Sequence, residues 1–258
     1  MRSFYVTLPS NSSMEHYPNN VMAEYVTRLS KIVDLKGEWE VGLVEMQYPR
    51  SWHNIPNNPL ARRFKVIASS LTNANASDAT HYFQISPGYY PSIQHIFDEI
   101  KRGVAQALNE TQLRRIDFET CEATRTISVT CNRCIVEVPP HIQEILPMGS
   151  SRLWLEGEIT TGEPFDLEPV KSLYVYCNLV EPRTVGDHSV PLLRIVPVEG
   201  KNGDLVTRIY DKAHYIPLQR KQFQTAEVYI RDHTGEKVPF ERGTLNVTLH
   251  FRRSKHPL

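Results

Sequence analysis

The stretch TLNVTLHFR (residues 244–252) decides the fold class, because its side chains alternate with a period of two. The apolar members are Leu245, Val247, Leu249 and Phe251, and a polar residue separates each from the next. Successive side chains of a β-strand point to opposite faces, so this stretch predicts a strand with one face buried and the other in water. Strands of this kind are typical of antiparallel sheets.

The same alternation appears upstream of residues 244–252. It recurs at residues 4–8, 39–43, 173–179 and 225–231. The turn residues DHTG (232–235) follow the last of these runs, and they predict a hairpin with residues 244–252. Two prolines bracket residues 192–196 and favour an edge or a bend there. A bulge is expected near Gly42, and Trp39 and Phe251 are expected in the core.

The middle of the chain has a different character. It contains a polar tract at residues 69–80 and one strong helical pattern at about residues 91–109, with apolar side chains at three- and four-residue spacing. Three short strand patterns follow at residues 116–119, 126–130 and 135–138. The middle therefore predicts an inserted α+β subdomain whose helix packs on a small antiparallel sheet.

Composition excludes several classes of function. Lysine plus arginine and aspartate plus glutamate each total 29, so the chain lacks the positive field that nucleic-acid-binding proteins use, and sequence-specific nucleic-acid binding is not expected. The start has no apolar run typical of a secretory signal, and no segment approaches the roughly 18 apolar residues of a membrane span. We therefore expect synthesis in the cytoplasm, no secretion and no membrane partner.

The four cysteines allow one metal hypothesis. Cys131 and Cys134 have the C-x2-C spacing of half a zinc site. A closed structural zinc site needs four ligands, and Cys121 and Cys177 do not form a second pair of that spacing. Two ordinary thiols at the start of a strand are the favoured interpretation, and no cofactor or metal is expected.

The short signatures of common enzymes are missing. The sequence has no phosphate-binding loop, no dinucleotide fingerprint, no H-E-x-x-H and no G-x-S-x-G. A cysteine–histidine hydrolase would need His141 or His188 to meet a thiol through the fold. Cys177 lies on the apolar parity of its strand, which favours packing over reactivity. The sequence therefore predicts a protein without catalytic activity.

Three segments carry a resemblance to a known family. They are WEVGLVEMQYP (39–49), YVYCNLVEP (174–182), and IRD (230–232) together with VTLHFR (247–252). These segments resemble the minor capsid, or penton, proteins of Polinton/Maverick elements, which are large transposons related to double-stranded DNA viruses. Such proteins are similar to the single jelly-roll penton proteins of the adenovirus lineage.

The resemblance implies a mainly β fold, a single jelly-roll sandwich formed by residues 1–52 and 171–258. The α+β subdomain inserted at residues 53–170 is predicted from the residue patterns alone, because the resemblance does not extend over it. It also implies a structural role, in which five copies form a homopentamer at each vertex of an icosahedral virus-like particle. The implied partners are further copies of the chain and the major capsid protein of the same element. A host-surface receptor reached through the insertion is a separate hypothesis, because a unit that projects from the sandwich is a favourable place for recognition. The implied location is the virion, after synthesis in the host cytoplasm.

Three outward-facing tyrosines are the predicted subunit contacts. Tyr174, Tyr176 and Tyr229 alternate with the apolar residues of their strands, and tyrosine contributes a large contact area at low entropic cost. They could instead pack beneath loops or the insertion. Two other functions stay open: a receptor- or carbohydrate-binding sandwich, and a trimeric subunit of the major-capsid type. The latter has two jelly rolls per chain, for which 258 residues with an insertion leave too little length.

Overall fold

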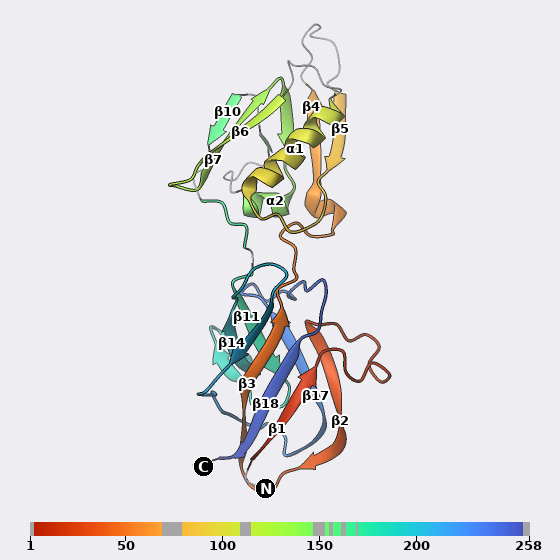
Figure 1. The fold of residues 1–258 in the computed structure, drawn as a ribbon, viewed down its shortest axis with the longest axis vertical. Coiled ribbons are helices and arrows are strands. Elements are labelled where there is room, and N and C mark those ends of the chain that lie inside the picture. Colours follow the sequence, from red (N-terminus) through yellow and green to blue (C-terminus); the bar gives the residue numbers. More distant parts are fainter. Residues whose placement is uncertain are drawn as a thin grey trace. The chain divides into compact units, whose positions relative to one another are not determined.

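The computed structural model describes residues 3–68, 79–108, 115–146, 153–154, 157–160, 164–168 and 170–254. The chain divides into two compact units. The first, here called the sandwich unit, consists of Met1–Trp52 and Val170–Leu258, and the second, the inserted unit, is His53–Pro169. The sandwich unit is therefore discontinuous in sequence, because the chain leaves it once and returns once (Figure 1).

Two antiparallel sheets form the sandwich unit. The β18 sheet has the order β1 (Ser3–Pro9), β18 (Asn246–Arg253), β3 (Trp39–Pro49) and β15 (Leu205–Ile209), with the short β16 (Ile216–Pro217) also paired to β3. The β17 sheet has the order β14 (Leu192–Pro197), β11 (Ser172–Cys177), β17 (Gln222–Arg231) and β2 (Glu24–Asp34). A small hairpin of β12 (Arg183–Val185) and β13 (His188–Val190) accompanies them.

The eight long strands are connected as a jelly roll. The chain passes from β1 to β2 in the other sheet and back to β3. After the inserted unit it runs through β11 and β14, crosses to β15, crosses back to β17, and ends in β18. The first strand pairs with the last, with Phe4 opposite Phe251 and their rings stacked 4.8 Å apart. The predicted fold class, a single jelly-roll sandwich with an inserted α+β part, is confirmed.

The core of the sandwich unit lies between the two sheets and follows from the alternation of each strand. Val247, Leu249 and Phe251 of β18 are fully buried in one cluster with the apolar residues of β17 and β11. Trp39 belongs to the same cluster, as predicted. The Tyr25 hydroxyl on β2 donates a hydrogen bond of 2.9 Å to the backbone carbonyl oxygen of residue 8 on β1, which ties the two sheets together at one edge.

The predicted hairpin between residues 225–231 and 244–252 is wrong. The turn itself forms, because the Gly235 amide donates to the Asp232 carbonyl oxygen at 3.2 Å and the Thr234 amide donates to Asp232 Oδ1 at 2.8 Å. The strands on either side of it nevertheless belong to different sheets. Pairing with β1 and β3 occupies both edges of β18, so no edge is left for β17.

The predicted bulge near Gly42 is confirmed. Val44 is the extra residue of β3 opposite the step from Thr248 to Leu249. Gly42 faces outward beside it, and a Cβ at this position would lie 2.9 Å from the backbone carbonyl oxygen of His214. The absence of a side chain therefore lets the segment 210–215 pass close over the outer face of β3.

The inserted unit is α+β. One sheet has the order β5 (Ala79–Gln84), β4 (Arg63–Ala68), β8 (Cys134–Glu137) and β9 (Leu153–Trp154), and the other has the order β10 (Gly157–Thr160), β7 (Thr126–Asn132) and β6 (Arg115–Cys121). The helices are α1 (Ile93–Ala107) and α2 (Pro140–Ile145), and a short 3-10 turn, η1, spans Pro59–Arg62. Neither α-helix of the described residues has the length and apolar character needed to cross a membrane.

The helix α1 packs its apolar stripe against β5 and β6. Its buried members are Ile93, Ile96, Phe97, Ile100 and Val104. The predicted helix and the strands β6, β7 and β8 are confirmed. The strands β4 and β5 were not predicted. Most of the polar tract at residues 69–80 lies outside the described residues.

We expect the substitution Gly103→Ala to destabilise the inserted unit. Alanine in a helix interior normally stabilises by about 0.5–1 kcal/mol relative to glycine. At Gly103, however, a Cβ would lie 2.0 Å from a ring carbon of Phe83 on β5. Overpacking of this kind costs about 1–3 kcal/mol, so the sign of the effect should reverse. Thermal unfolding monitored by circular dichroism measures it.

The matched control is Gln106→Ala, on the exposed side of the same helix. It should leave the unfolding temperature unchanged or raise it slightly. A Gly103→Ala variant as stable as this control would contradict the packing of α1 on β5.

Candidate subunit interface

The three predicted contact tyrosines lie together on the outer face of the β17 sheet. Tyr176 on β11 is paired directly with Tyr229 on β17, and their rings stack with centroids 4.9 Å apart and planes 8° from parallel. Tyr174, two residues earlier on β11, is paired with Arg231. The residues that alternate with them on the same strands, such as Val175, are buried in the core, so the three tyrosine side chains point outward.

Charged groups border the stacked rings. Glu24 on β2 accepts contacts of 2.9 Å from both Arg231 Nη2 and Lys237 Nζ. The hydrogen bond from Lys237 is the main reason why the pKa of Glu24 lies below its ordinary value, and Arg231 adds to the effect. Arg231 also lies 5.8 Å from the centre of the Tyr229 ring. We call Tyr174, Tyr176 and Tyr229, with Glu24, Arg231 and Lys237, the tyrosine surface.

The tyrosine surface combines partial burial with exposed apolar area. Burial raises the pKa of Tyr176 and of Tyr229, so both hydroxyls stay protonated at neutral pH and can donate hydrogen bonds. Ile195 on the edge strand β14 is paired with Tyr174, and 43% of its surface is exposed. Tyrosine and arginine are the residue types enriched where binding energy concentrates in protein interfaces.

The cysteine and histidines considered for hydrolysis have other local roles. Cys177 is fully buried, and burial raises the pKa of its thiol to about 12, which disfavours the reactive thiolate. His141 lies in the inserted unit, where Nε2 is 2.8 Å from the Asn54 carbonyl oxygen. His188 lies in the β12–β13 hairpin beside Asp187 and is exposed. Each group is therefore accounted for by packing or by local polar contacts.

The C-x2-C pair forms a corner of the inserted unit. Cys131 is the last residue but one of β7 in one sheet, and Cys134 begins β8 in the other. Both thiols are buried, and the hydrogen bond between them, with burial, raises the pKa of Cys131. Among the described residues, no group of three or more His, Cys, Asp and Glu side chains is arranged to hold a metal ion.

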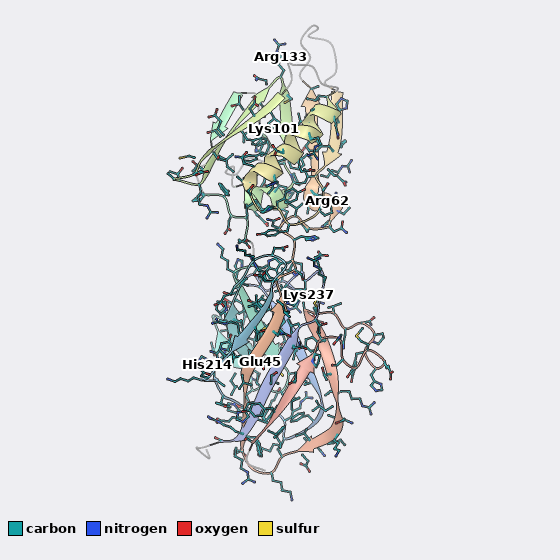
Figure 2. All side chains as sticks on the ribbon, in the orientation of Figure 1. Glu45, Arg62, Lys101, Arg133, His214 and Lys237 are labelled. Atoms are coloured by element: carbon teal, nitrogen blue, oxygen red, sulfur yellow. The ribbon has the colours of Figure 1, made fainter. Side chains whose placement is uncertain are left out.

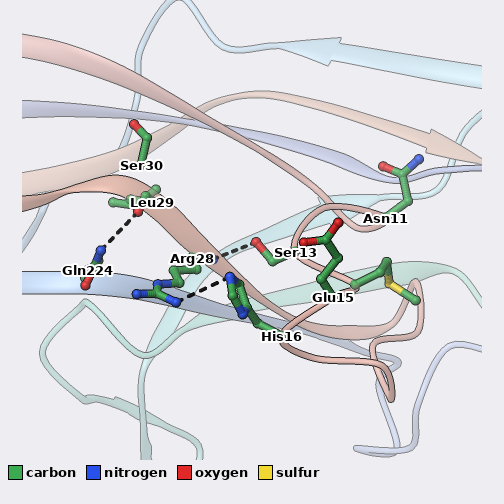
Figure 3. Close-up of a pocket in the computed structure, with 9 residues that line it drawn as sticks. Asn11, Ser13, Glu15, His16, Arg28, Leu29, Ser30 and Gln224 are labelled. Atoms are coloured by element: carbon green, nitrogen blue, oxygen red, sulfur yellow. Dashed lines mark hydrogen bonds between the residues drawn. The ribbon is translucent and has the colours of Figure 1, made fainter.

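A polar hollow of about 580 Å³ lies beside the loop that follows β1 (Figure 3). Arg28 on β2 anchors this loop, because its amide donates to Ser13 Oγ at 2.9 Å and its guanidinium donates to His16 Nε2 at 3.3 Å. Gln224 of β17 donates to the carbonyl oxygen of Leu29 at 3.5 Å. The two bonds of Arg28 hold the loop against the sheet, and the bond of Gln224 joins β17 to β2. We assign the hollow no catalytic chemistry.

A second aromatic cluster lies on the outer face of the β18 sheet. The Tyr5 ring stacks on His250 with centroids 4.4 Å apart, and the Tyr215 hydroxyl lies 2.7 Å from His250 Nδ1. The guanidinium of Arg252 lies 3.3 Å from the centre of the Tyr215 ring. Burial lowers the pKa of His250, and Arg252 adds to the effect, so the imidazole is neutral at neutral pH.

This cluster borders a cavity of about 420 Å³, which we call the β18-face pocket. Its lining is Tyr5, Val44, Glu45, Ile209, Tyr210, Asp211, Ala213, Tyr215, Thr248 and His250. Sequence reasoning missed it, although the alternation of Phe4, Val6 and Leu8 already implied that Tyr5 points outward. Tyr215 had no comparable signal, because it reaches His250 from an irregular segment 35 residues away.

No family model matches the sequence, and no curated protein matches it either. Solved structures do match. The crystal structure of the mavirus penton protein aligns over 98% of this chain and 99% of its own length, with a TM-score of 0.52 and 12% identity. A chain in the cryo-EM structure of the Sputnik virophage aligns over 98% of both chains, with a TM-score of 0.46 and 12% identity.

This chain has the fold of the mavirus penton protein. The resemblance to penton proteins predicted from the sequence is therefore confirmed at the level of the fold. Both the sandwich unit and the inserted unit lie within the match to the mavirus penton protein, because almost the whole of each chain is aligned. The inserted unit is thus part of the shared architecture, although its sequence carried no resemblance.

We expect one of the four thiols to react quickly in the folded protein. Cys121 is exposed, and the hydrogen bond to Thr124 lowers the pKa of its thiol, whereas the other three thiols are buried. A colorimetric thiol titration should therefore show one fast equivalent at neutral pH and four after unfolding. The variant Cys121→Ser should show none before unfolding. A fast equivalent remaining in that variant would reopen the hypothesis of a reactive cysteine.

Proposed function

We propose that this chain is a non-enzymatic capsid subunit that forms a homopentamer at the vertices of an icosahedral virus-like particle, beside the major capsid protein of the same element. The observation that carries the proposal is the end-to-end match to the mavirus penton protein, which includes the inserted unit. The presence of one jelly roll per chain supports a penton role over a trimeric major-capsid role, for which two are implied. The same proposal places the protein in the virion after synthesis in the host cytoplasm.

The tyrosine surface is the proposed site of contact between copies. Its three tyrosines and Arg231 supply large, partly preorganised side chains, because Tyr176 and Tyr229 are already stacked on each other. The stack fixes two rings before a partner arrives, so less rotamer entropy is lost on binding. The paired charges of Glu24, Arg231 and Lys237 form a polar rim of the kind that surrounds interface cores.

A second role, recognition of a host-surface receptor, is proposed for the inserted unit. A hollow of about 410 Å³ there is lined by Leu60, Arg63, Lys65, Tyr82, Glu137, Val138, Pro139 and Pro140. Lys65 is paired with Glu137 at 3.6 Å, which leaves Arg63 as the cation that faces a partner. The Arg63 guanidinium lies 4.2 Å from the centre of the exposed Tyr82 ring. A cation held over an aromatic face beside exposed apolar area favours binding of a partner that carries carboxylate or hydroxyl groups.

The solution mass of the purified chain tests the proposed pentamer. Light scattering should give a species of about five times the 29.7 kDa chain mass. The triple variant Tyr174→Thr, Tyr176→Thr and Tyr229→Thr should give mostly the mass of one chain, because it removes the aromatic area while keeping β propensity. Circular dichroism should show that the variant is folded.

The matched control is Tyr82→Thr, which removes an exposed tyrosine from the inserted unit. It should leave the mass of the assembly unchanged. A trimeric mass for the wild-type chain would move the function toward a major-capsid role. Five-chain assemblies of the triple variant would exclude the tyrosine surface from the contact.

A further inference from the structure

A closed ring of identical subunits needs two different surfaces on each chain, because every copy contacts one neighbour on each side. The tyrosine surface can supply only one of them. The second must be complementary to it and must lie elsewhere on the same chain. This requirement holds only if the proposed pentamer forms, so the contact assigned to the second surface rests on the proposed function.

The β18-face pocket has the exposed apolar area that such a surface needs. Tyr5 is 66% exposed, Ile209 is 71% exposed and Leu205, on the same face of β15, is 60% exposed. These are among the most exposed large apolar side chains of the sandwich unit. They lie on the outer face of the β18 sheet, whereas the tyrosine surface lies on the outer face of the β17 sheet. If the outer face of the β17 sheet of one copy meets the outer face of the β18 sheet of the next, the copies are arranged head to tail.

The pocket is also held in a fixed shape. Tyr5 stacks on His250, His250 contacts the Tyr215 hydroxyl, and Tyr215 packs under Arg252. Arg252 in turn donates to Glu40 Oε1 at 2.5 Å. This chain of contacts joins β1, β18, β3 and the segment 210–215, so an incoming side chain meets a surface that needs little rearrangement.

Charge distinguishes the two surfaces. Glu45 on β3 and Asp211 line the pocket, and within the described residues neither carboxylate has a hydrogen bond or an ion pair. On the tyrosine surface, Arg231 and Lys237 share the single carboxylate of Glu24. The turn beside them also carries two carboxylates: that of Asp232 accepts the amides of Thr234 and Glu236, and Glu236 itself is exposed. Glu227, beside Tyr229, lies toward the other end. Glu45 and Lys237 are labelled in Figure 2, on β3 and after β17 respectively.

We propose that the β18-face pocket receives the tyrosine surface of a neighbouring copy, with Glu45 and Asp211 directed toward Arg231 and Lys237 of that copy. Unpaired carboxylates opposite two cations that share a single carboxylate give an attraction that selects one register of the two faces. The aromatic side chains on both sides then exclude water from the centre of the contact. The occupant of the pocket is a second copy of this chain.

Charge reversal with rescue tests the contact. The pocket variant is Glu45→Lys with Asp211→Lys, and the facing variant is Arg231→Glu with Lys237→Glu. Each should raise the concentration at which half of the rings dissociate by about tenfold or more, since like charges then face each other. Combining all four substitutions in one chain should restore most of the lost association. Light scattering over a dilution series measures all three, with circular dichroism to verify folding.

The matched control reverses two exposed carboxylates away from both surfaces, Glu122→Lys with Asp187→Lys, and changes the net charge by the same amount as the pocket variant. It should dissociate like the wild type. If the wild type is pentameric and the pocket variant is equally pentameric, this contact is wrong and the proposed function still stands. The same holds if the pocket variant weakens the pentamer and the four-fold variant does not restore it. The pocket would then bind another occupant, such as a segment of the capsid protein. If the wild-type chain is monomeric at every concentration, both the proposed function and this contact are contradicted.

Discussion

Pairing between the two ends of the chain is the interaction on which the rest of the structure depends. The strand β18 lies between β1 and β3, and all seven residues of β1 are in register with it. Phe4 and Phe251 stack across this pairing and both contact the sandwich core. The sheet is therefore incomplete until the last strand is in place, and the two termini are bound into the same layer. This closure is non-local, which is the kind of pairing that slows folding.

The insertion follows from the same closure. The chain leaves the sandwich after β3 and returns at β11, a crossing between sheets where a connection of any length leaves the strand pairings intact. The inserted unit has its own buried core, formed by α1 and the two small sheets, so neither unit depends on the other for its core. Within the sandwich unit, one outer face carries stacked tyrosines beside Arg231 and Lys237, and the other carries an aromatic pocket lined in part by Glu45 and Asp211.

Much of this architecture could be predicted from alternation alone. Period-two patterns in β1, β3, β11, β17 and β18 identified the buried side chains correctly, and the outward parity of Tyr174, Tyr176 and Tyr229 was correct as well. Alternation specifies which side chain is buried but carries no information about which strand is the neighbour. That is why the turn at Asp232 was identified and the hairpin inferred from it was wrong. Alternation could not predict that β18 pairs with β1, because Thr7 and its partner Thr248 lie 241 positions apart in the sequence.

The β18-face pocket shows a second limit of sequence reasoning. Its shape depends on Gly42, where the missing side chain lets the segment 210–215 lie across β3 and bring Tyr215 to His250. In the sequence, Gly42 indicated a bulge but not what it makes room for. The strands β4 and β5 were also missed, although Phe64, Val66 and Ala68 of β4 have the buried alternation of a strand. In the folded unit β4 lies between β5 and β8 and pairs with both.

The symmetry of the assembled wild-type protein tests the central claim most directly. Cryo-electron microscopy of the purified chain, at concentrations above the dissociation point, gives that symmetry without any substitution. We expect class averages with five-fold symmetry in which the outer face of the β17 sheet of each copy meets the outer face of the β18 sheet of the next. Two-fold or three-fold rings, or a five-fold ring whose subunits meet through other surfaces, would contradict it.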